Sequence, residues 1–158
     1  MAGKFSLRKF SDINLADHFF DSLKADYPGT DSSPSFITWF NKKAGEGRTA
    51  LIFDDEEGLG AFISLKAEIE EIKLQGGNLP IKQRTKISTL RIAERYRGQR
   101  LGEGAIGLVL WKWQQLGHEE IYVTVYPSHN DLIGQLEKFG FTLAGYNLDG
   151  ECVYMRSR

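Results

Sequence analysis

The stretch Arg97-Gly98-Gln99-Arg100-Leu101-Gly102-Glu103-Gly104 lies between a predicted strand over 85–92 and a predicted helix that continues to about Leu116. Glycines between a strand and a helix let backbone N–H groups face outward, and the following helix directs the positive end of its dipole to the same place. Arg97 and Arg100 add positive charge. The stretch therefore predicts an anion site suited to phosphate, with a solvated turn as the structural alternative.

Two familiar phosphate-binding patterns do not fit this stretch. A dinucleotide fold needs its glycine turn after an early strand, with an acidic residue about 20 residues later. Here the turn lies about two-thirds of the way along a chain of 158 residues. A nucleoside triphosphate loop ends in Gly-Lys-Ser or Gly-Lys-Thr, and neither tripeptide occurs in the sequence. A different phosphate compound is expected.

The composition is that of an ordinary globular protein, with 41% hydrophobic and 26% charged residues. A net charge of -1 gives no basic field for nucleic acid. The single cysteine, Cys152, excludes an internal disulfide and fits a reducing compartment. The first residues lack the apolar core of a signal peptide, and no stretch is long enough to span a membrane. We therefore expect a cytoplasmic protein without nucleic acid or membrane partners.

Hydrophobic periodicity predicts a single α/β (α+β) domain over residues 1–158, with a mixed, mostly antiparallel sheet of about seven strands flanked by about four helices. A surface loop is expected over 75–82 because it contains Gly76-Gly77-Asn78 and Pro80. Asp12 or Asn14 is expected to cap the first helix, and Ser33-Pro34 to begin the second. The expected elements are strands 5–10, 49–53, 85–92, 120–126, 141–144 and 151–155, a longer strand from Gly60, and helices 14–25, 34–44, 101–116 and 130–138.

The residues from Leu90 to Gly102 resemble the acetyl-coenzyme A motif of the GNAT superfamily of N-acetyltransferases. That motif reads Gln or Arg, two residues, Gly, one residue, then Gly or Ala. Two registers are open, 97–102 and 99–104, and we prefer the first because the preceding strand and Tyr96-Arg97-Gly98 then align together. Glu137-Lys138-Phe139-Gly140-Phe141 resembles the late Lys-x-Gly-Phe signature of the family. The resemblance covers most of the chain and agrees with the predicted element order.

The resemblance implies acetyl-CoA as cosubstrate, and no cluster of histidine, cysteine, aspartate and glutamate in the sequence suggests a metal site. It implies that backbone amides of about Arg97 to Gly102 hold the pyrophosphate, and that the pantetheine arm lies in a gap between the strand ending at Ile92 and strand 120–126. A backbone N–H near Ile92 would polarise the thioester carbonyl. Asn130 would reach the arm, or cap the helix that follows it. The implied cofactor-binding residues are Leu90, Arg91, Ile92, Arg97, Gly98, Gln99, Arg100, Leu101, Gly102, Glu103 and Asn130.

The implied reaction is direct attack of a primary amine on the acetyl carbonyl, which needs a base for the ammonium and benefits from an acid for the thiolate. Relatives often place a tyrosine where this chain has Leu136, so the acid is unassigned. The catalytic candidates are Glu68, Glu70, Tyr126 and Glu137. Each has a structural alternative: an exposed charge for Glu68 and Glu70, a strand aromatic for Tyr126 and a solvated helix residue for Glu137.

Two functions therefore remain open at this level. The first is an acetyl-CoA-dependent N-acetyltransferase whose acceptor amine is unknown. The second is a non-catalytic CoA-binding or regulatory module on the same fold, which Leu136 favours. A homodimer is compatible with the resemblance, but the sequence has no apolar stripe that requires one.

Overall fold

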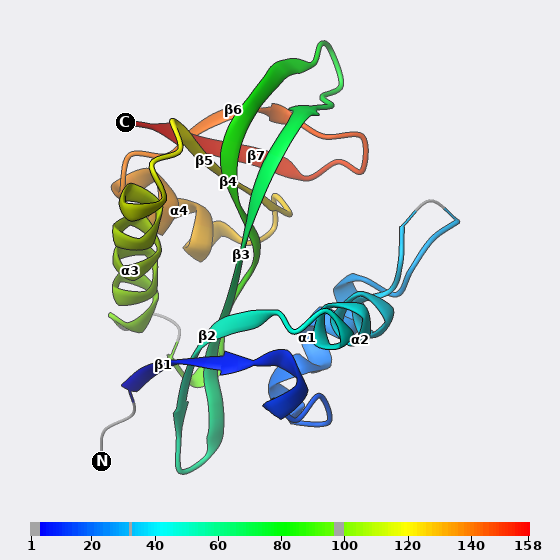
Figure 1. Ribbon diagram of the computed structural model, residues 1–158, viewed down its shortest axis with the longest axis vertical. Helices are drawn as coiled ribbons and strands as arrows, with labels where there is room; N and C mark the ends of the chain where they lie inside the picture. The colour runs from blue at the N-terminus through cyan, green and yellow to red at the C-terminus, as the bar shows by residue number, and fades with distance from the viewer. Residues whose placement is uncertain (1–3, 32, 97–99) are drawn as a thin grey trace. The chain divides into compact units, whose positions relative to one another are not determined.

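The computed structural model describes residues 4–31, 33–96 and 100–158. This part of the chain forms seven strands and four α-helices (Figure 1). The helices are α1 (Asp21–Asp26), α2 (Phe36–Gly45), α3 (Leu101–Leu116) and α4 (Asn130–Lys138). The strands are β1 (Lys4–Lys9), β2 (Thr49–Asp55), β3 (Gly58–Ile72), β4 (Leu79–Ile92), β5 (Glu120–Val125), β6 (Thr142–Tyr146) and β7 (Cys152–Ser157).

The seven strands form one sheet in the order β1-β2-β3-β4-β5-β7-β6. The pairs β1–β2, β2–β3, β5–β7 and β6–β7 are antiparallel, whereas β4 and β5 are parallel neighbours. Parallel strands need a long crossover connection, which α3 provides here. The predicted mixed, mostly antiparallel sheet is confirmed. Contacts divide the chain into two compact units, residues 1–64 and 65–158.

The first unit is held together by phenylalanine side chains. Phe10 lies with its ring centroid 4.9 Å from that of Phe40 and 5.5 Å from that of Phe62. Phe20 lies 5.8 Å from Phe36 and 5.4 Å from Phe62. All five side chains are buried. Because aromatic side chains bury a large apolar area and attract one another edge to face, this cluster fastens the short α1 and α2 to the strands of their unit.

The first helix is shorter than the sequence predicts. A 3₁₀ turn over His18–Phe20 precedes α1 and is capped by Asp17, whereas the N-cap position of α1 itself is Phe20, not Asp12 or Asn14. The Asp17 carboxylate accepts the Phe19 N–H at 2.9 Å and the Leu59 N–H at 3.4 Å. Asn14 instead accepts the Ala16 N–H at 3.0 Å in a local turn. A tertiary contact with Leu59 at the start of β3 therefore accompanies the choice of Asp17 as the cap of the 3₁₀ turn.

The second helix also begins later than predicted. Ser35 caps α2 and its hydroxyl accepts the Thr38 N–H at 3.2 Å, so Ser33-Pro34 precedes the helix and does not begin it. The cap residue type was predicted correctly, but the position was wrong by two residues. Two serines flanking one proline satisfy the same local preference, and only the surrounding backbone selects between them.

In the second unit, α3 buries one face and is held at its C-terminal end. Its buried residues are Gly102, Ala105, Ile106, Val109, Leu110 and Trp113, whereas Leu101 and Leu108 are only half-buried. These six buried residues form the face of α3 that packs into the core of the unit. Gly117 caps the C-terminus in the left-handed region with φ 77°, a conformation that glycine adopts without strain.

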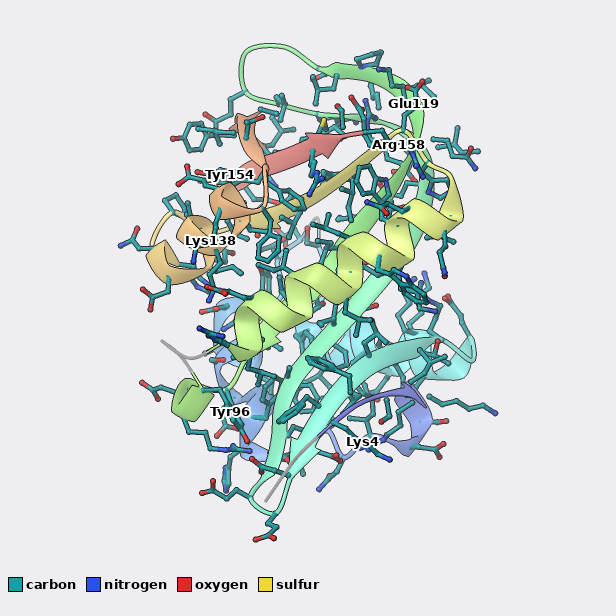
Figure 2. The ribbon with its side chains drawn as sticks, turned by 90° about the vertical axis from the view of Figure 1, so that its left-hand side faces the viewer. Lys4, Tyr96, Glu119, Lys138, Tyr154 and Arg158 are labelled. Atoms are coloured by element: carbon teal, nitrogen blue, oxygen red, sulfur yellow. The ribbon has the colours of Figure 1, made fainter. Side chains whose placement is uncertain are left out.

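The strand β7 ends against the C-terminal turn of α3. Arg158 donates from Nε to the His118 carbonyl at 2.9 Å and from a terminal nitrogen to the Gln114 carbonyl at 2.9 Å. Its guanidinium also lies 5.3 Å from the centroid of the Trp113 ring. Figure 2 shows Arg158 beside that end of α3. Carbonyls of a helix C-terminus lack helical donors, so Arg158 satisfies them.

Two hairpin ends meet in the same unit. Leu74 forms an antiparallel bridge with Asn147, and the Gln75 N–H donates to the Tyr146 carbonyl at 2.9 Å. The predicted loop over 75–82 was too long, because β4 begins at Leu79 and includes Pro80. The first β4 residue with a partner on β5 is Arg84. A proline before that point removes no hydrogen bond to β5, and so the strand tolerates it.

We expect Asp17→Ala to lower the free energy of unfolding by about 1–2 kcal/mol, because two N–H groups lose their acceptor. Asp12→Ala is the matched control, since Asp12 is exposed and does not cap α1. Urea denaturation of both variants measures the difference. Equal losses in the two variants would contradict the assignment of Asp17 as the cap.

We expect Arg158→Ala to lower the free energy of unfolding by about 1 kcal/mol, because the carbonyls at the C-terminal end of α3 lose a charged donor. Arg158→Lys should recover only part of this loss, since an ammonium cannot reproduce the planar donor pattern. Thermal unfolding followed by circular dichroism measures both variants. A lysine variant as stable as the parent would show that charge alone is sufficient.

Candidate functional site

The parallel strands β4 and β5 part before either strand ends. Their pairing runs from Arg84↔Glu120 to Ile87↔Val123, and β4 then continues for five residues, Ser88 to Ile92. On its other side β5 stays paired with β7 as far as Val125↔Cys152. The edge of a strand that has left its neighbour can offer backbone N–H and C=O groups to another extended chain. We call the stretch Ser88–Ile92 the open edge of β4.

The N-terminus of α3 follows the open edge in the chain. Arg100 occupies the N-cap, and the Gly104 N–H donates to the Arg100 carbonyl at 2.9 Å as the first helical bond. The N–H groups of Leu101, Gly102 and Glu103 precede that bond and therefore have no acceptor within the helix. Such groups, together with the helix dipole, favour an anion. Of the predicted phosphate-binding turn, Arg97, Gly98 and Gln99 lie outside the described residues.

The first turn of α3 is packed against α4, and Figure 1 shows the two helices side by side. Gly102 is buried, and the side-chain amide of Gln135 occupies the place that a Cβ at position 102 would need. Lys138 donates to the Glu103 carboxylate at 2.8 Å, and this hydrogen bond is the main reason why the pKa of Glu103 is lowered. A glycine at position 102 thus permits the close approach that fixes the helix N-terminus.

Asn130 is the first residue of α4, and the N-cap is His129. The alternative that Asn130 caps the helix is therefore wrong. Its side chain is exposed at the end of the loop that follows β5. Contact between Asn130 and the cofactor arm stays a prediction.

The buried residue at position 68 is the main departure from the sequence pattern. Period-two alternation places Glu68 on a polar face and Ile69 inside, but only 7% of Glu68 is exposed, against 68% of Ile69. One Glu68 oxygen accepts the hydroxyl proton of Tyr122, and the other lies 3.2 Å from Lys66 Nζ. We call these three side chains the Glu68 cluster. Burial, followed by the hydrogen bond and charge of Glu68, raises the pKa of Tyr122.

The Glu68 cluster lies at the closed end of the gap between β4 and β5. Tyr122 pairs with Lys86, one residue before the last pair, Ile87↔Val123. Lys86 Nζ lies 5.9 Å from the centroid of the Tyr122 ring. No feature of the sequence marks this contact, because Glu68 and Tyr122 are 54 positions apart and their strands are separated by β4 in the sheet. The sequence shows one local sign of a change in the strand pattern: apolar residues alternate at odd positions up to Ile69 and at even positions from Ile72.

Tyr122 faces away from α3. Arg156 pairs with Ile121 on the neighbouring strand, and its guanidinium lies 5.9 Å from the centroid of the Trp113 ring of α3. Side chains alternate between the two faces of a strand. Ile121 is therefore on the face covered by α3, and Tyr122 is on the opposite face together with its cross-strand partner Met155.

The other catalytic candidates lie elsewhere. The Glu70 side chain is exposed, and its carbonyl accepts a hydrogen bond from Arg84 at 3.1 Å. Tyr126 is half-buried, with its ring centroid 6.3 Å from that of His129. Glu137 is exposed on α4. The catalytic roles of all four candidates therefore stay predictions.

Glu137 and Leu136 lie on α4 away from its contacts with the first turn of α3. Burial first, and then the charge of Glu137, raises the pKa of Tyr154 on β7. Figure 2 shows Tyr154 and Lys138 near α4. Gln135 and Lys138 contact α3, and 100° per residue turns Glu137 away from that side of α4. Leu136 is fully buried, which is consistent with a packing role.

The described residues contain neither a metal-binding cluster nor a membrane-spanning helix. Within residues 4–31, 33–96 and 100–158, no group of three or more histidine, cysteine, aspartate or glutamate side chains could hold a metal ion. The helices of the same ranges are too short or too polar to cross a membrane.

Comparison with known proteins supplies the family. An N-acetyltransferase from Staphylococcus aureus Mu50 is 13% identical with a TM-score of 0.66, and 99% of each chain is covered. The ribosomal-protein-S18-alanine N-acetyltransferase from Escherichia coli is 16% identical with a TM-score of 0.64, and 98% of this chain and 91% of that chain are covered. Arabidopsis thaliana Naa50, in complex with the bisubstrate analogue CoA-Ac-MVNAL, is 20% identical with a TM-score of 0.58, and 98% and 99% are covered.

At these identities the solved structures show a shared fold. A search of curated protein sequences gave no match. The model of the acetyltransferase (GNAT) family matches residues 16–141, which is most of the 158 residues and spans both compact units. The chain therefore belongs to the GNAT acetyltransferase family.

Proposed function

We propose that this protein transfers the acetyl group of acetyl-CoA to a primary amine by direct attack of the amine on the thioester. The observation that carries the proposal is the parting of β4 and β5 after Ile87↔Val123, followed in the chain by the N-terminus of α3. One feature offers an extended binding edge and the other an anion site. Together they suit a molecule that joins an extended arm to a pyrophosphate.

The dimensions of the open edge suit the pantetheine arm. The arm is a chain of about twelve bonds with two amides, and each residue of an extended strand contributes three backbone bonds, so the arm is as long as roughly four residues. The open edge of β4 has five residues, Ser88 to Ile92. An arm whose pyrophosphate lies on the amides of about Arg97 to Gly102 would therefore bring its thioester near the closed end of the gap.

The chemistry needs three contributions from the chain. A backbone N–H of the open edge would polarise the thioester carbonyl and stabilise the oxyanion that forms on attack. A base must remove a proton from the ammonium form of the acceptor, and we propose Glu68 because it lies at the closed end of the gap. The departing thiolate would gain a proton from the attacking nitrogen, since Leu136 cannot donate one.

The acceptor class is proposed from the similar structures. One of them is named for the alanine of ribosomal protein S18, and another holds an analogue that joins CoA to a peptide. Peptides with a free N-terminus are therefore the first acceptors to test. We also propose that both compact units act as one catalytic domain, because the family model spans them, and that the protein works in the cytoplasm.

We expect acetyl-CoA to bind, and Arg100→Glu to weaken its binding about tenfold, which corresponds to ~1.4 kcal/mol. The reason is that the variant replaces a positive charge at the N-cap of α3 by a negative charge beside the pyrophosphate. Isothermal titration calorimetry with acetyl-CoA measures both affinities.

Lys112→Glu is the matched control, because it makes the same change of charge on the same helix, three turns from the N-terminus. The expected affinity of this variant is that of the parent. Equal weakening by both variants would show that net charge, and not the N-terminus of α3, determines the effect. Absent binding of acetyl-CoA to the parent chain at hundreds of micromolar would refute the proposed function.

We expect thiol release from acetyl-CoA to rise when a suitable primary amine is added. The panel consists of an alanine-first peptide, a Met-Val-Asn-Ala-Leu peptide, an N-terminally blocked peptide with one lysine, and spermidine. Acetylation at the amine, seen by mass spectrometry, confirms transfer. Tight binding of acetyl-CoA without transfer to any amine would favour a CoA-binding module, the reading that Leu136 suggests.

A further inference from the structure

We propose that Tyr122 is a positioning residue, which holds the Glu68 carboxylate so that it can take the proton of the acceptor ammonium, with Lys66 as the second support. This inference rests on the proposed function, in which Glu68 is the base, and it says which side chains hold Glu68 in place. Neither Tyr122 nor Lys66 was a candidate from the sequence. The juxtaposition of the two with Glu68 arises only in the folded sheet.

The cluster is built as a fully partnered carboxylate. A buried ionised carboxylate is unfavourable unless donors or opposite charges surround it. Here each oxygen of Glu68 has its own partner, the Tyr122 hydroxyl on Oε1 and Lys66 Nζ on Oε2. Only 6% of the Glu68 side chain is exposed, whereas 39% of Lys66 is exposed. The lysine therefore connects the buried carboxylate with the more accessible part of the same face.

Tyr122 is held firmly enough to orient its partner. Its backbone pairs with Lys86 on one side and with Met155 on the other. Its ring lies in the buried cluster formed with Ile72 and Val153. Burial raises the pKa of Tyr122 well above the ordinary value, and so the phenol keeps its proton and remains a donor. A fixed donor limits the orientations of the carboxylate, which reduces the entropy lost when the acceptor binds.

The position of the cluster agrees with the direction of attack. The α3 helix covers the face of β5 that carries Ile121, and the Glu68 cluster is on the opposite face. An acceptor that approaches a thioester at the closed end of the gap must come from the face that α3 leaves open. Glu68 accepts the hydroxyl proton of Tyr122 on that face, and Tyr122 lies one residue pair from the point where β4 and β5 part.

The proton transfers balance without a further reactant. The ammonium gives one proton to the Glu68 carboxylate, and the freed lone pair forms the C–N bond. The C–S bond then breaks with its electron pair on sulfur, and a second proton from the nitrogen ends on the thiolate. The carboxylic acid returns its proton to solvent, and Tyr122 donates to Glu68 throughout without changing its own charge.

Other charged groups lie nearby but have different partners. Arg84 donates to Glu120 at 2.7 Å and to the Glu70 carbonyl at 3.1 Å. Lys86 lies over the Tyr122 ring. Together with Lys66 and Glu70, these are the charged groups from β3, β4 and β5 that surround the cluster, and Tyr122 is the hydroxyl that reaches Glu68.

The test compares Tyr122→Phe with the parent chain, using the fastest acceptor of the amine panel. We expect kcat to fall about tenfold with an unchanged KM for acetyl-CoA, since the phenol donates to Glu68 and its proposed role is to hold that carboxylate. We also expect the acid limb of the kcat profile to move to higher pH, because the charged carboxylate loses a donor. Tyr146→Phe is the control, since Tyr146 is exposed on β6 and lies outside the cluster.

A second pair of variants tests the base itself. Glu68→Gln keeps the size of the side chain and an acceptor for Tyr122, and should lower kcat about a hundredfold or more. Glu71→Gln on the same strand is its control, because Glu71 is exposed. Acetyl-CoA affinity should stay unchanged in all four variants.

The outcomes separate the inference from the proposed function. If the parent turns over no amine of the panel, the proposed function fails and takes the inference with it. If the parent transfers acetyl groups but Tyr122→Phe keeps the parent pH profile, only the positioning role is overturned. If Tyr122→Phe does not fold, Lys66→Met replaces it, and an unmoved acid limb in that variant overturns the inference equally.

Discussion

The parting of β4 and β5 after Ile87↔Val123 is the constraint on which the rest of the second unit depends. Backbone N–H and C=O groups that leave a sheet ladder need other partners, and a chain normally avoids this cost. Here β5 remains held by β7, while β4 continues to Ile92 without pairing with β5. Because β5 is anchored by β7 and β4 no longer pairs with it, the two strands are separate beyond Ile87↔Val123.

The elements around the gap are fixed by contacts that lie away from it. Gly102 lets Gln135 approach closely and Lys138 holds Glu103, and so the N-terminus of α3 is positioned by α4. At the other end of the same helix, Arg158 satisfies the carbonyls that follow Trp113. The proposed anion site uses only backbone N–H groups at the start of α3. The stability of α3 comes from side chains packed along the rest of the helix, so binding and stability depend on different groups.

The two faces of the sheet near the gap have different chemistry. The face under α3 is apolar and close-packed, with Ile106, Val109 and Trp113 buried against it. The opposite face carries the Glu68 cluster, where a carboxylate is buried with one donor on each oxygen. A protein that only needed stability would gain from an apolar replacement at such a position. We propose Glu68 for catalysis because a charged carboxylate is buried at the closed end of the gap.

The sequence by itself determined the element order, the mixed sheet and the turn that resembles an acetyl-CoA motif, because these depend on local periodicity and on glycine and proline signals. It did not determine that Asp17 caps the 3₁₀ turn before α1 and also accepts the Leu59 N–H, or the side on which Glu68 points. Both depend on residues more than forty positions apart. Only the tertiary structure decided that β4 and β5 part at Ile87↔Val123 and that Glu68 and Tyr122 meet there, since a strand pattern read along the chain carries no information on its neighbours across the sheet.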